Sequence, residues 1–251
     1  MGAGLPLALL LAVALPEPPR GGAEGPPPSE RALVAVRALL ARPVFLQVLL
    51  GISVGAFAVY GKAQWYPAFY VRSHGLSLTQ IGVYGSLASG LGGILGILAG
   101  GAAMVRLRPR DARWELWLPM AGYLVAIPFA LLTLSADDHR MAFLAQFIAV
   151  FTGASGGGAS LAALQGQAEP HRRATAAALM LILSSLVGLG LGPVAVGGLS
   201  DLLAPRFGAD SLRVAMLVAT AIYAWAALHF ALAARAARRD PGQALPATGK
   251  A

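Results

Sequence analysis

Residues 81–104 read IGVYGSLASGLGGILGILAGGAAM, an apolar run without a charged side chain. A helix needs about 20 consecutive apolar residues to cross the hydrocarbon core of a bilayer. Strands of a transmembrane barrel would need shorter segments in which polar and apolar residues alternate, and this run does not alternate. The stretch therefore predicts a transmembrane α-helix.

The rest of the chain repeats this pattern. Apolar residues make up 57% of the 251 residues and charged residues only 12%, about half the charged share of a soluble domain. We therefore expect an all-α membrane protein, with a six-helix transmembrane bundle over residues 43–235. The six expected spans are Pro43–Tyr70, Gln80–Met104, Trp114–Leu134, Met141–Leu164, Thr175–Leu203 and Leu212–Arg235.

The basic residues predict how the bundle is oriented, because cytoplasmic connections collect Lys and Arg. Of the 19 basic residues, 14 fall on one side of the six spans and four on the other, and Lys62 lies inside a span. The N-terminus and the tail over residues 236–251 are therefore expected on the cytoplasmic side of the cell (inner) membrane. The larger group is Arg20, Arg31, Arg37, Arg42, Arg106, Arg108, Arg110, Arg113, Arg172, Arg173, Arg235, Arg238, Arg239 and Lys250.

Several function classes are excluded by composition. The net charge of +8 does not predict a nucleic-acid partner, because the arginines sit between spans and form no continuous stripe. The chain has no Cys, which excludes disulfides and thiolate metal sites. A GLGLG sequence in an apolar span lacks the preceding strand of a nucleotide-binding turn. No cofactor, metal or catalytic residue is expected.

The N-terminal residues 1–42 divide into two parts. Residues 1–15, MGAGLPLALLLAVAL, are interpreted as the remnant of a preceding transmembrane helix; a signal peptide or anchor and a disordered segment are the alternatives. Residues 16–42 form a cytoplasmic linker rich in Pro and Gly, followed by an amphipathic helix that Ser29 would cap.

Two glycine-rich spans suggest an internal repeat. Residues 90–101 read GLGGILGILAGG and residues 188–198 read GLGLGPVAVGG, in the middle helices of two groups of three. Weak similarity of this kind is typical of a 3+3 inverted repeat, although glycine-rich helices also resemble one another by chance. The expected helix-packing residues are Gly92, Gly96, Gly100, Gly188, Gly192 and Pro193; the glycines form small-residue faces, and Pro193 predicts a kink.

Several motifs occur in the order found in one transporter family. They are WYPAFY at 65–70 with RSHGLS at 72–77, the glycine-rich second span, RLRPRD at 106–111, RRATA at 172–176, GLGLGP at 188–193, GADSLR at 208–213 and LHF at 228–230. In these motifs the chain resembles the C-terminal half of a major facilitator superfamily transporter of the spinster-like branch. The resemblance covers residues 33–240 and implies that the six spans are the family's seventh to twelfth.

The resemblance also implies a cytoplasmic gate in the connections between spans. The gating residues expected from it are Arg106, Arg110, Asp111, Arg172 and Arg173. Members of the family usually carry an acidic residue before the first of these arginines, and Val105 stands there in this chain. Asp111 is the alternative source of the missing carboxylate.

Polar side chains inside the spans are the candidates for substrate binding, because such groups are costly in a membrane. We expect them to be Tyr60, Lys62, Gln64, Tyr66, Gln146 and Ser155. Lys62 could meet an anionic group in a central cavity, or it could extend to the outer headgroups. Gln146 could line the cavity or serve inter-helix hydrogen bonding.

These observations predict a transporter that works by alternating access on a small-molecule or lipid-like substrate. Its partners would be the lipid bilayer and a missing N-terminal six-helix half or a second copy, so the chain alone should not transport. A dimerising half-transporter or scaffold is one alternative. A rhomboid-like intramembrane serine protease, with Ser155 and His229 as nucleophile and base, is the other.

Overall fold

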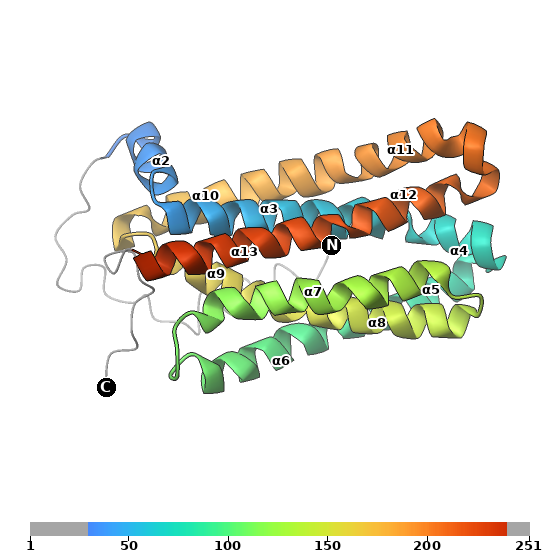
Figure 1. Ribbon diagram of the computed structural model, residues 1–251, viewed down its shortest axis with the longest axis horizontal. Helices are drawn as coiled ribbons and strands as arrows, with labels where there is room; N and C mark the ends of the chain where they lie inside the picture. Colours follow the sequence, from blue (N-terminus) through green and yellow to red (C-terminus); the bar gives the residue numbers. More distant parts are fainter. Residues whose placement is uncertain (1–29, 240–251) are drawn as a thin grey trace, which may run out of the picture. The chain divides into compact units, whose positions relative to one another are not determined.

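The computed structural model describes residues 30–239, and all regular structure among them is helical (Figure 1). Residues 31–239 belong to one compact unit. Three predicted features lie outside the described residues: the helix remnant at 1–15, the linker with its Ser29 cap, and the tail beyond residue 239. The fold class is the predicted all-α bundle of apolar helices.

The first predicted span is broken near its C-terminal end. After the short helix α2 (Ala32–Leu40), helix α3 runs from Pro43 to Ala63 and α4 runs from Tyr66 to His74. The expectation of one helix over residues 43–70 is therefore wrong. Pro67 explains the break, because its nitrogen has no hydrogen to donate to the Ala63 carbonyl one turn earlier. Gly75, with φ of +63°, ends α4 in the left-handed conformation.

The second span consists of α5 (Leu78–Gly85), a π-helical segment η1 (Ser86–Leu91) and α6 (Gly92–Leu107). Ser77 and Gln80 form a capping box at its start, where each side chain bonds the backbone of the other. The π-helical segment widens the helix by one residue per turn just before Gly92.

The third and fourth spans form an antiparallel pair. Helix α7 covers Trp114–Ser135 and α8 covers His139–Ser155, with Asp138 capping the start of α8. A short further helix, α9 (Gly157–Gly166), continues the fourth span after Gly156. A Cβ at Gly156 would collide with the Pro119 backbone of α7, so only glycine allows this close approach.

The fifth and sixth spans lie in one long helical stretch over Pro170–Arg239. It contains η2 (Pro170–Arg172), α10 (Arg173–Ser184), the π-helical η3 (Ser185–Leu191), α11 (Gly192–Phe207), η4 (Gly208–Asp210), α12 (Ser211–Thr220) and α13 (Ile222–Arg239). By length and hydropathy, the described residues thus hold five membrane-spanning candidates. The fifth candidate contains both remaining predicted spans. Within it the chain reverses at Gly208, where φ is +54°, so that α12 packs against α11.

The first three spans (α3 to α7) and the last three (α8 to α13) each place a helix against the other group. Helix α6 of the first group packs against α8 of the second, and η3 and α11 of the second group pack against α3 of the first. The π-helical segments occupy matching places, since each ends where a glycine begins the next helix, at Gly92 and Gly192. This exchange is the symmetry expected of an inverted repeat.

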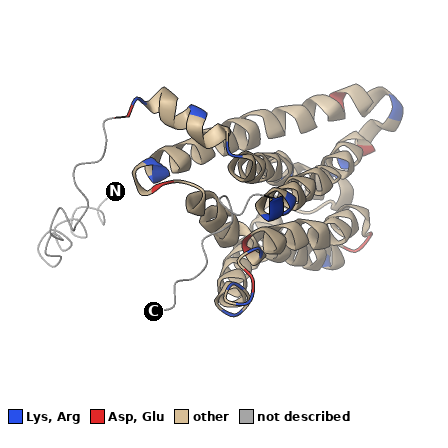
Figure 2. Ribbon diagram, turned by 60° about the vertical axis from the view of Figure 1, so that its left-hand side comes forward, with Lys and Arg blue, Asp and Glu red and all other residues tan. Residues whose placement is uncertain are grey.

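Most Lys, Arg, Asp and Glu residues of the described chain lie at helix ends and in the connections between helices (Figure 2). The apolar spans between them carry many exposed large hydrophobic residues, for example Ile97, Leu186 and Val194. In water such a surface would be unstable, whereas in a bilayer it faces hydrocarbon or another helix. The distribution therefore supports the membrane setting predicted from composition.

Candidate functional site

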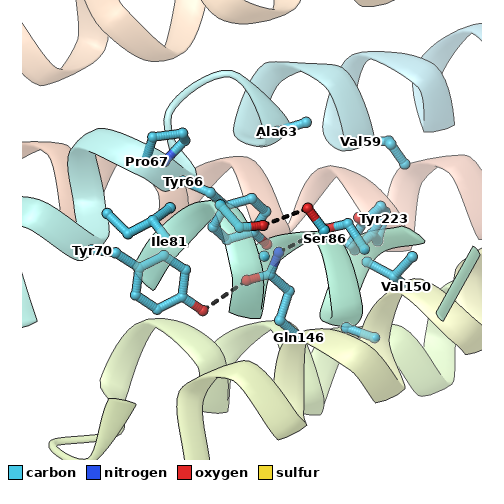
Figure 3. Close-up of a pocket in the computed structure, with 14 residues that line it drawn as sticks. Val59, Ala63, Tyr66, Pro67, Tyr70, Ile81, Ser86, Gln146, Val150 and Tyr223 are labelled. Atoms are coloured by element: carbon cyan, nitrogen blue, oxygen red, sulfur yellow. Dashed lines mark hydrogen bonds between the residues drawn. The ribbon is translucent and has the colours of Figure 1, made fainter. Parts of the chain in front are cut away.

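A cavity of about 520 Å³ lies between the first, second, fourth and sixth spans (Figure 3). Its walls are mostly apolar, and none of its lining residues is charged. The residues that line it are Val59, Ala63, Tyr66, Pro67, Tyr70, Ile81, Gly82, Gly85, Ser86, Ser89, Gln146, Ala149, Val150 and Tyr223. The broken helix α3–α4 and the π-helical segment η1 both contribute to it, so the two irregular parts of the first three spans meet at the cavity.

Gln146 on α8 is the polar centre of the cavity wall. The Tyr70 hydroxyl donates a hydrogen bond of 2.7 Å to its Oε1, and its Nε2 donates one of 2.8 Å to Ser89 Oγ (Figure 3). Gln146 is 2% exposed. A buried amide is stable only when its donors and acceptors are paired, and this network pairs it while linking three spans. Gln146 therefore lines the cavity and also forms hydrogen bonds between helices, so the two expected roles are compatible.

Lys62 lies behind the cavity wall, not in it. It is 1% exposed, its Nζ donates a 3.2 Å hydrogen bond to Thr220 Oγ1, and the ammonium lies 4.1 Å from the centre of the Tyr223 ring. Its alternative role as a side chain extending to the outer headgroups is therefore wrong. Among residues 30–239 no carboxylate pairs with it. Tyr223, whose ring the ammonium contacts, lines the cavity, whereas Lys62 does not.

Of the six residues predicted to bind substrate, the structure places Tyr66 and Gln146 on the cavity. Tyr60 and Gln64 are exposed on α3 and just after it, outside the cavity lining. Ser155 donates to the Thr152 carbonyl at 2.7 Å, and its backbone lies against Gly100 of α6. Ser155 thus takes part in the contact between α8 and α6.

The predicted packing glycines lie against the neighbouring group of helices. Gly92, Gly96 and Gly100 are buried and face the backbone of α8 at Phe147, Phe151 and Ser155. Gly188 and Gly192 face α3, and a Cβ on Gly192 would lie 3.0 Å from the Gly61 Cα.

Pro193 is the second residue of α11, beside this contact, and its carbonyl accepts a 3.0 Å hydrogen bond from the Trp65 indole. Both glycine faces are used within the chain, so they are not free for a second copy.

Acidic residues in and next to the connections between spans form local ion pairs. Asp111 pairs with Arg113 two residues later, at 2.5 Å, and this hydrogen-bonded guanidinium holds the pKa of Asp111 below its usual range. Asp111 therefore forms a local pair within its own connection. Arg108 pairs with Glu115, a carboxylate at the start of α7.

A second charged cluster ties the start of α3 to the connection after α9. Arg42 donates to the Gln167 carbonyl and to Glu169 Oε1, both at 2.5 Å, and Arg172 holds Glu169 Oε2 at 2.5 Å. Of the other predicted gating residues, Arg106, Arg110 and Arg173 form no ion pair within residues 30–239.

The proposed protease pair is not assembled. His229 Nδ1 lies 2.7 Å from Gln47 Oε1, and Ser155 Oγ is bonded to a backbone carbonyl of its own helix. A nucleophile and its base must lie within hydrogen-bond reach of each other. Residues 30–239 also hold no group of three or more His, Cys, Asp or Glu placed for a metal ion.

Sequence reasoning missed four polar residues of the cavity. Tyr70 stood at the expected end of the first span, Ser86 and Ser89 were hidden among the glycines of the second, and Tyr223 looked like an ordinary aromatic of the sixth. The available signal for Ser86 and Ser89 was their spacing of three residues inside an apolar, glycine-rich span. Nothing local marked Tyr223, whose role depends on the packing of α13 against α3.

Comparison with known proteins agrees with the fold. The sequence profile of the Major Facilitator Superfamily matches residues 1–193. An MFS-type efflux pump of Mycolicibacterium smegmatis is 36% identical over 203 residues, covering 80% of this chain and 47% of the pump. Protein spinster homolog 1 of Bos taurus is 31% identical over 222 residues, covering 80% of this chain and 42% of the relative.

A solved structure is also similar. The crystal structure of a bacterial homolog to the human lysosomal transporter Spinster, inward-facing and unoccupied, superimposes with a TM-score of 0.73 at 27% identity. The match covers 94% of this chain and 57% of that one. The chain thus spans about half the length of the curated relatives it matches. Together, the profile, the relatives and the superposition show that the chain belongs to the Major Facilitator Superfamily, in its spinster-like branch.

Proposed function

We propose that the chain is the C-terminal half of a transporter that moves an amphipathic organic solute across the cell membrane by alternating access. The observation that carries the proposal is the cavity of about 520 Å³, with an apolar wall and one hydrogen-bonded polar centre at Gln146. Solute sites in proteins are commonly apolar cavities with a few well-placed polar groups. The family membership supports transport as the general activity.

The lining favours the less polar part of such a solute. Tyr66 and Tyr223 offer ring faces, while Gln146 and the two serines offer hydrogen bonds without charge. A formal charge on the solute would find no opposite charge among the lining residues. We therefore propose that this half holds an uncharged part of the substrate, and that any charged group binds to the other half.

Gln146→Leu tests the proposal, because leucine has a similar volume and removes both hydrogen bonds of the network. Cells would express the chain together with an N-terminal six-helix half, and efflux of neutral Nile red, cationic ethidium and anionic anilinonaphthalene sulfonate would be measured. We expect efflux of at least one dye above that of empty cells, and a reduction of about tenfold in the variant, the loss expected for one to two buried hydrogen bonds.

The matched control is Gln165→Leu, the same change at a half-buried position at the cytoplasmic end of α9. Its efflux should equal that of the unchanged protein, with equal amounts of each variant in the membrane. Equal efflux from Gln146→Leu and the unchanged protein would show that this cavity is not the substrate site.

A further inference from the structure

His74, the last residue of α4, lies at the end of the bundle opposite to α2 (Figure 1). The distribution of basic residues predicts that this end faces the outside. The imidazole ring packs on two aromatic rings, with ring centres 5.5 Å from Phe69 and 5.6 Å from Tyr70. Its Nε2 is buried and has no hydrogen-bond partner within residues 30–239. His74 is therefore a titratable group enclosed by apolar neighbours.

Tyr70 connects His74 to the cavity. The two residues are four positions apart on α4, so they share one face of the helix. The Tyr70 ring stacks on Phe143 of α8 at 4.1 Å, and its hydroxyl donates the 2.7 Å hydrogen bond to Gln146 Oε1 (Figure 3). His74 thus packs against the side chain that holds the polar centre of the cavity.

Several titratable groups act on His74. Burial of the ring is the main cause that lowers its pKa, and the nearby His139 lowers it further. A hydrogen bond with the Asp137 backbone and the carboxylates of Asp138 and Asp137 oppose this effect without cancelling it. The ring is therefore mostly neutral near neutral pH. Further titratable side chains on the surrounding elements are Tyr66, Tyr70 and Arg72 on α4, Tyr84 on α5 and Arg140 on α8.

Protonation of His74 would disturb this arrangement. A protonated imidazole carries a hydrogen on both ring nitrogens, and the described residues offer Nε2 no acceptor. A buried charged donor without an acceptor is costly, whereas water solvates it readily. Acid therefore favours a state in which the ring has left its place and no longer packs on Tyr70.

We propose that His74 is a positioning residue of the cavity: its neutral ring holds Tyr70 against Gln146, and its protonation from the outer side releases Tyr70. The inference rests on the proposed function, because it describes regulation of the same site. The packed state binds the proton less readily than a solvated histidine, whose pKa is about 6.5. The released state therefore gains as the pH falls through that value, and the packed state returns as the pH rises.

Fluorine NMR of the purified chain labelled with fluorotyrosine tests the proposal. The chain has six tyrosines, and the signal of Tyr70 is the one that disappears in Tyr70→Phe. A water-soluble gadolinium chelate broadens the signals of tyrosines that solvent reaches. At about pH 7.5 we expect the Tyr70 signal to stay sharp, because the side chain is buried, and at about pH 5 we expect its loss.

Three variants show whether His74 causes the change. His74→Phe keeps an aromatic ring that cannot be protonated, so the Tyr70 signal should stay sharp at both pH values. His74→Gln is also neutral throughout and gives the same test if the larger ring disturbs folding. His139→Gln is the matched control, since it removes a histidine from the same end of the bundle that does not pack on Tyr70; it should keep the acid response.

A Tyr70 signal that stays sharp at about pH 5 in the unchanged protein would overturn the proposal. Equal loss of the signal in His74→Phe and His74→Gln would do the same, and so would simultaneous loss of the Tyr223 signal, which would mean that acid unfolds the whole bundle. The readout is the exposure of one side chain and not efflux. A pH-independent Tyr70 therefore leaves the proposed transport function untouched, and unchanged efflux in Gln146→Leu leaves the acid response of Tyr70 untouched.

Discussion

Lys62 is a buried cation that meets a hydroxyl and an aromatic ring instead of a carboxylate. The Thr220 hydroxyl and the Tyr223 ring stabilise the ammonium only in part, because a charge moved from water into a protein interior loses more than such contacts return. A residue of this kind in a membrane protein is usually kept for function. We therefore expect Lys62 to serve transport at a cost in stability.

Lys62→Met should separate the two effects. Methionine keeps the length of the side chain and removes the charge, so we expect the free energy of unfolding to rise by about 1 kcal/mol or more. Transport by the chain combined with its N-terminal half should fall. Thermal unfolding in detergent and dye efflux measure the two quantities.

Arg140→Met is the control for Lys62→Met, because Arg140 is exposed at the start of α8 and the change removes a cation of similar length. It should leave both stability and efflux unchanged. A lower unfolding temperature for Lys62→Met than for the unchanged protein would mean that the contacts with Thr220 and Tyr223 outweigh the cost of burial.

At the scale of the helix, the close contacts of α6 with α8 depend on glycine. The face formed by Gly92, Gly96 and Gly100 lies directly on the α8 backbone, with no room for a Cβ at Gly100. Small residues in such faces let two helices approach closely, which is a main source of stability between membrane helices. At the neighbouring Gly101, no atom of another helix lies within 4 Å of the place a Cβ would take.

Gly100→Ala and Gly101→Ala form a matched pair that tests this contact. Both add one methyl group to the same helix, and alanine favours a helix over glycine by about 1 kcal/mol. We expect Gly101→Ala to raise the free energy of unfolding by up to about that amount, and Gly100→Ala to lower it by about 1–3 kcal/mol through overpacking. Thermal unfolding in detergent compares the two, and equal values would show that the α6–α8 contact yields to a methyl group.

At the scale of the whole molecule, the described helices form half of the length of the relatives. The exchange of neighbours between the two groups of three makes the bundle a connected unit, since α3 packs on η3 and α6 packs on α8. In alternating access a unit of this kind moves as a body against a partner. We expect the Gln146 cavity to be completed by that partner.

We predict that the chain alone does not transport. Purified chain in liposomes should take up dye at the rate of empty liposomes, and co-reconstitution with an N-terminal six-helix half should restore uptake. Uptake by the chain alone that is lost in Lys62→Ala would contradict this prediction and would point to an assembly of copies of the chain.

Several features of the molecule could be read from the order of residues alone. Membrane-spanning helices need about 20 apolar residues regardless of their neighbours, so the runs between Pro43 and Arg235 predicted the helical bundle. The connections carry the charges that orient it. Gly92, Gly96 and Gly100 are spaced four residues apart, which places them on one face of a helix. The small-residue face could therefore be predicted from this one segment.

The break after Ala63 was missed, although Pro67 stood in the printed sequence. A proline inside an apolar run is often tolerated in membrane helices, and whether the helix breaks depends on what packs around it. Here Trp65 turns toward α11 and donates to the Pro193 carbonyl, a partner 128 residues away. No local pattern contains that contact.

The class of the protein follows from its residue order, because hydrophobic length and charge are properties of each segment in its solvent. The site depends on how the helices pack. Tyr70, Ser89 and Gln146 come from three different spans, and Lys62 meets Tyr223 only because α13 packs on α3. Likewise, His74 meets the backbone of Asp137 only because α4 lies beside the connection between α7 and α8. Hydrogen bonds and burial depend on which segments meet in space, and this information lies between segments, not within any one of them.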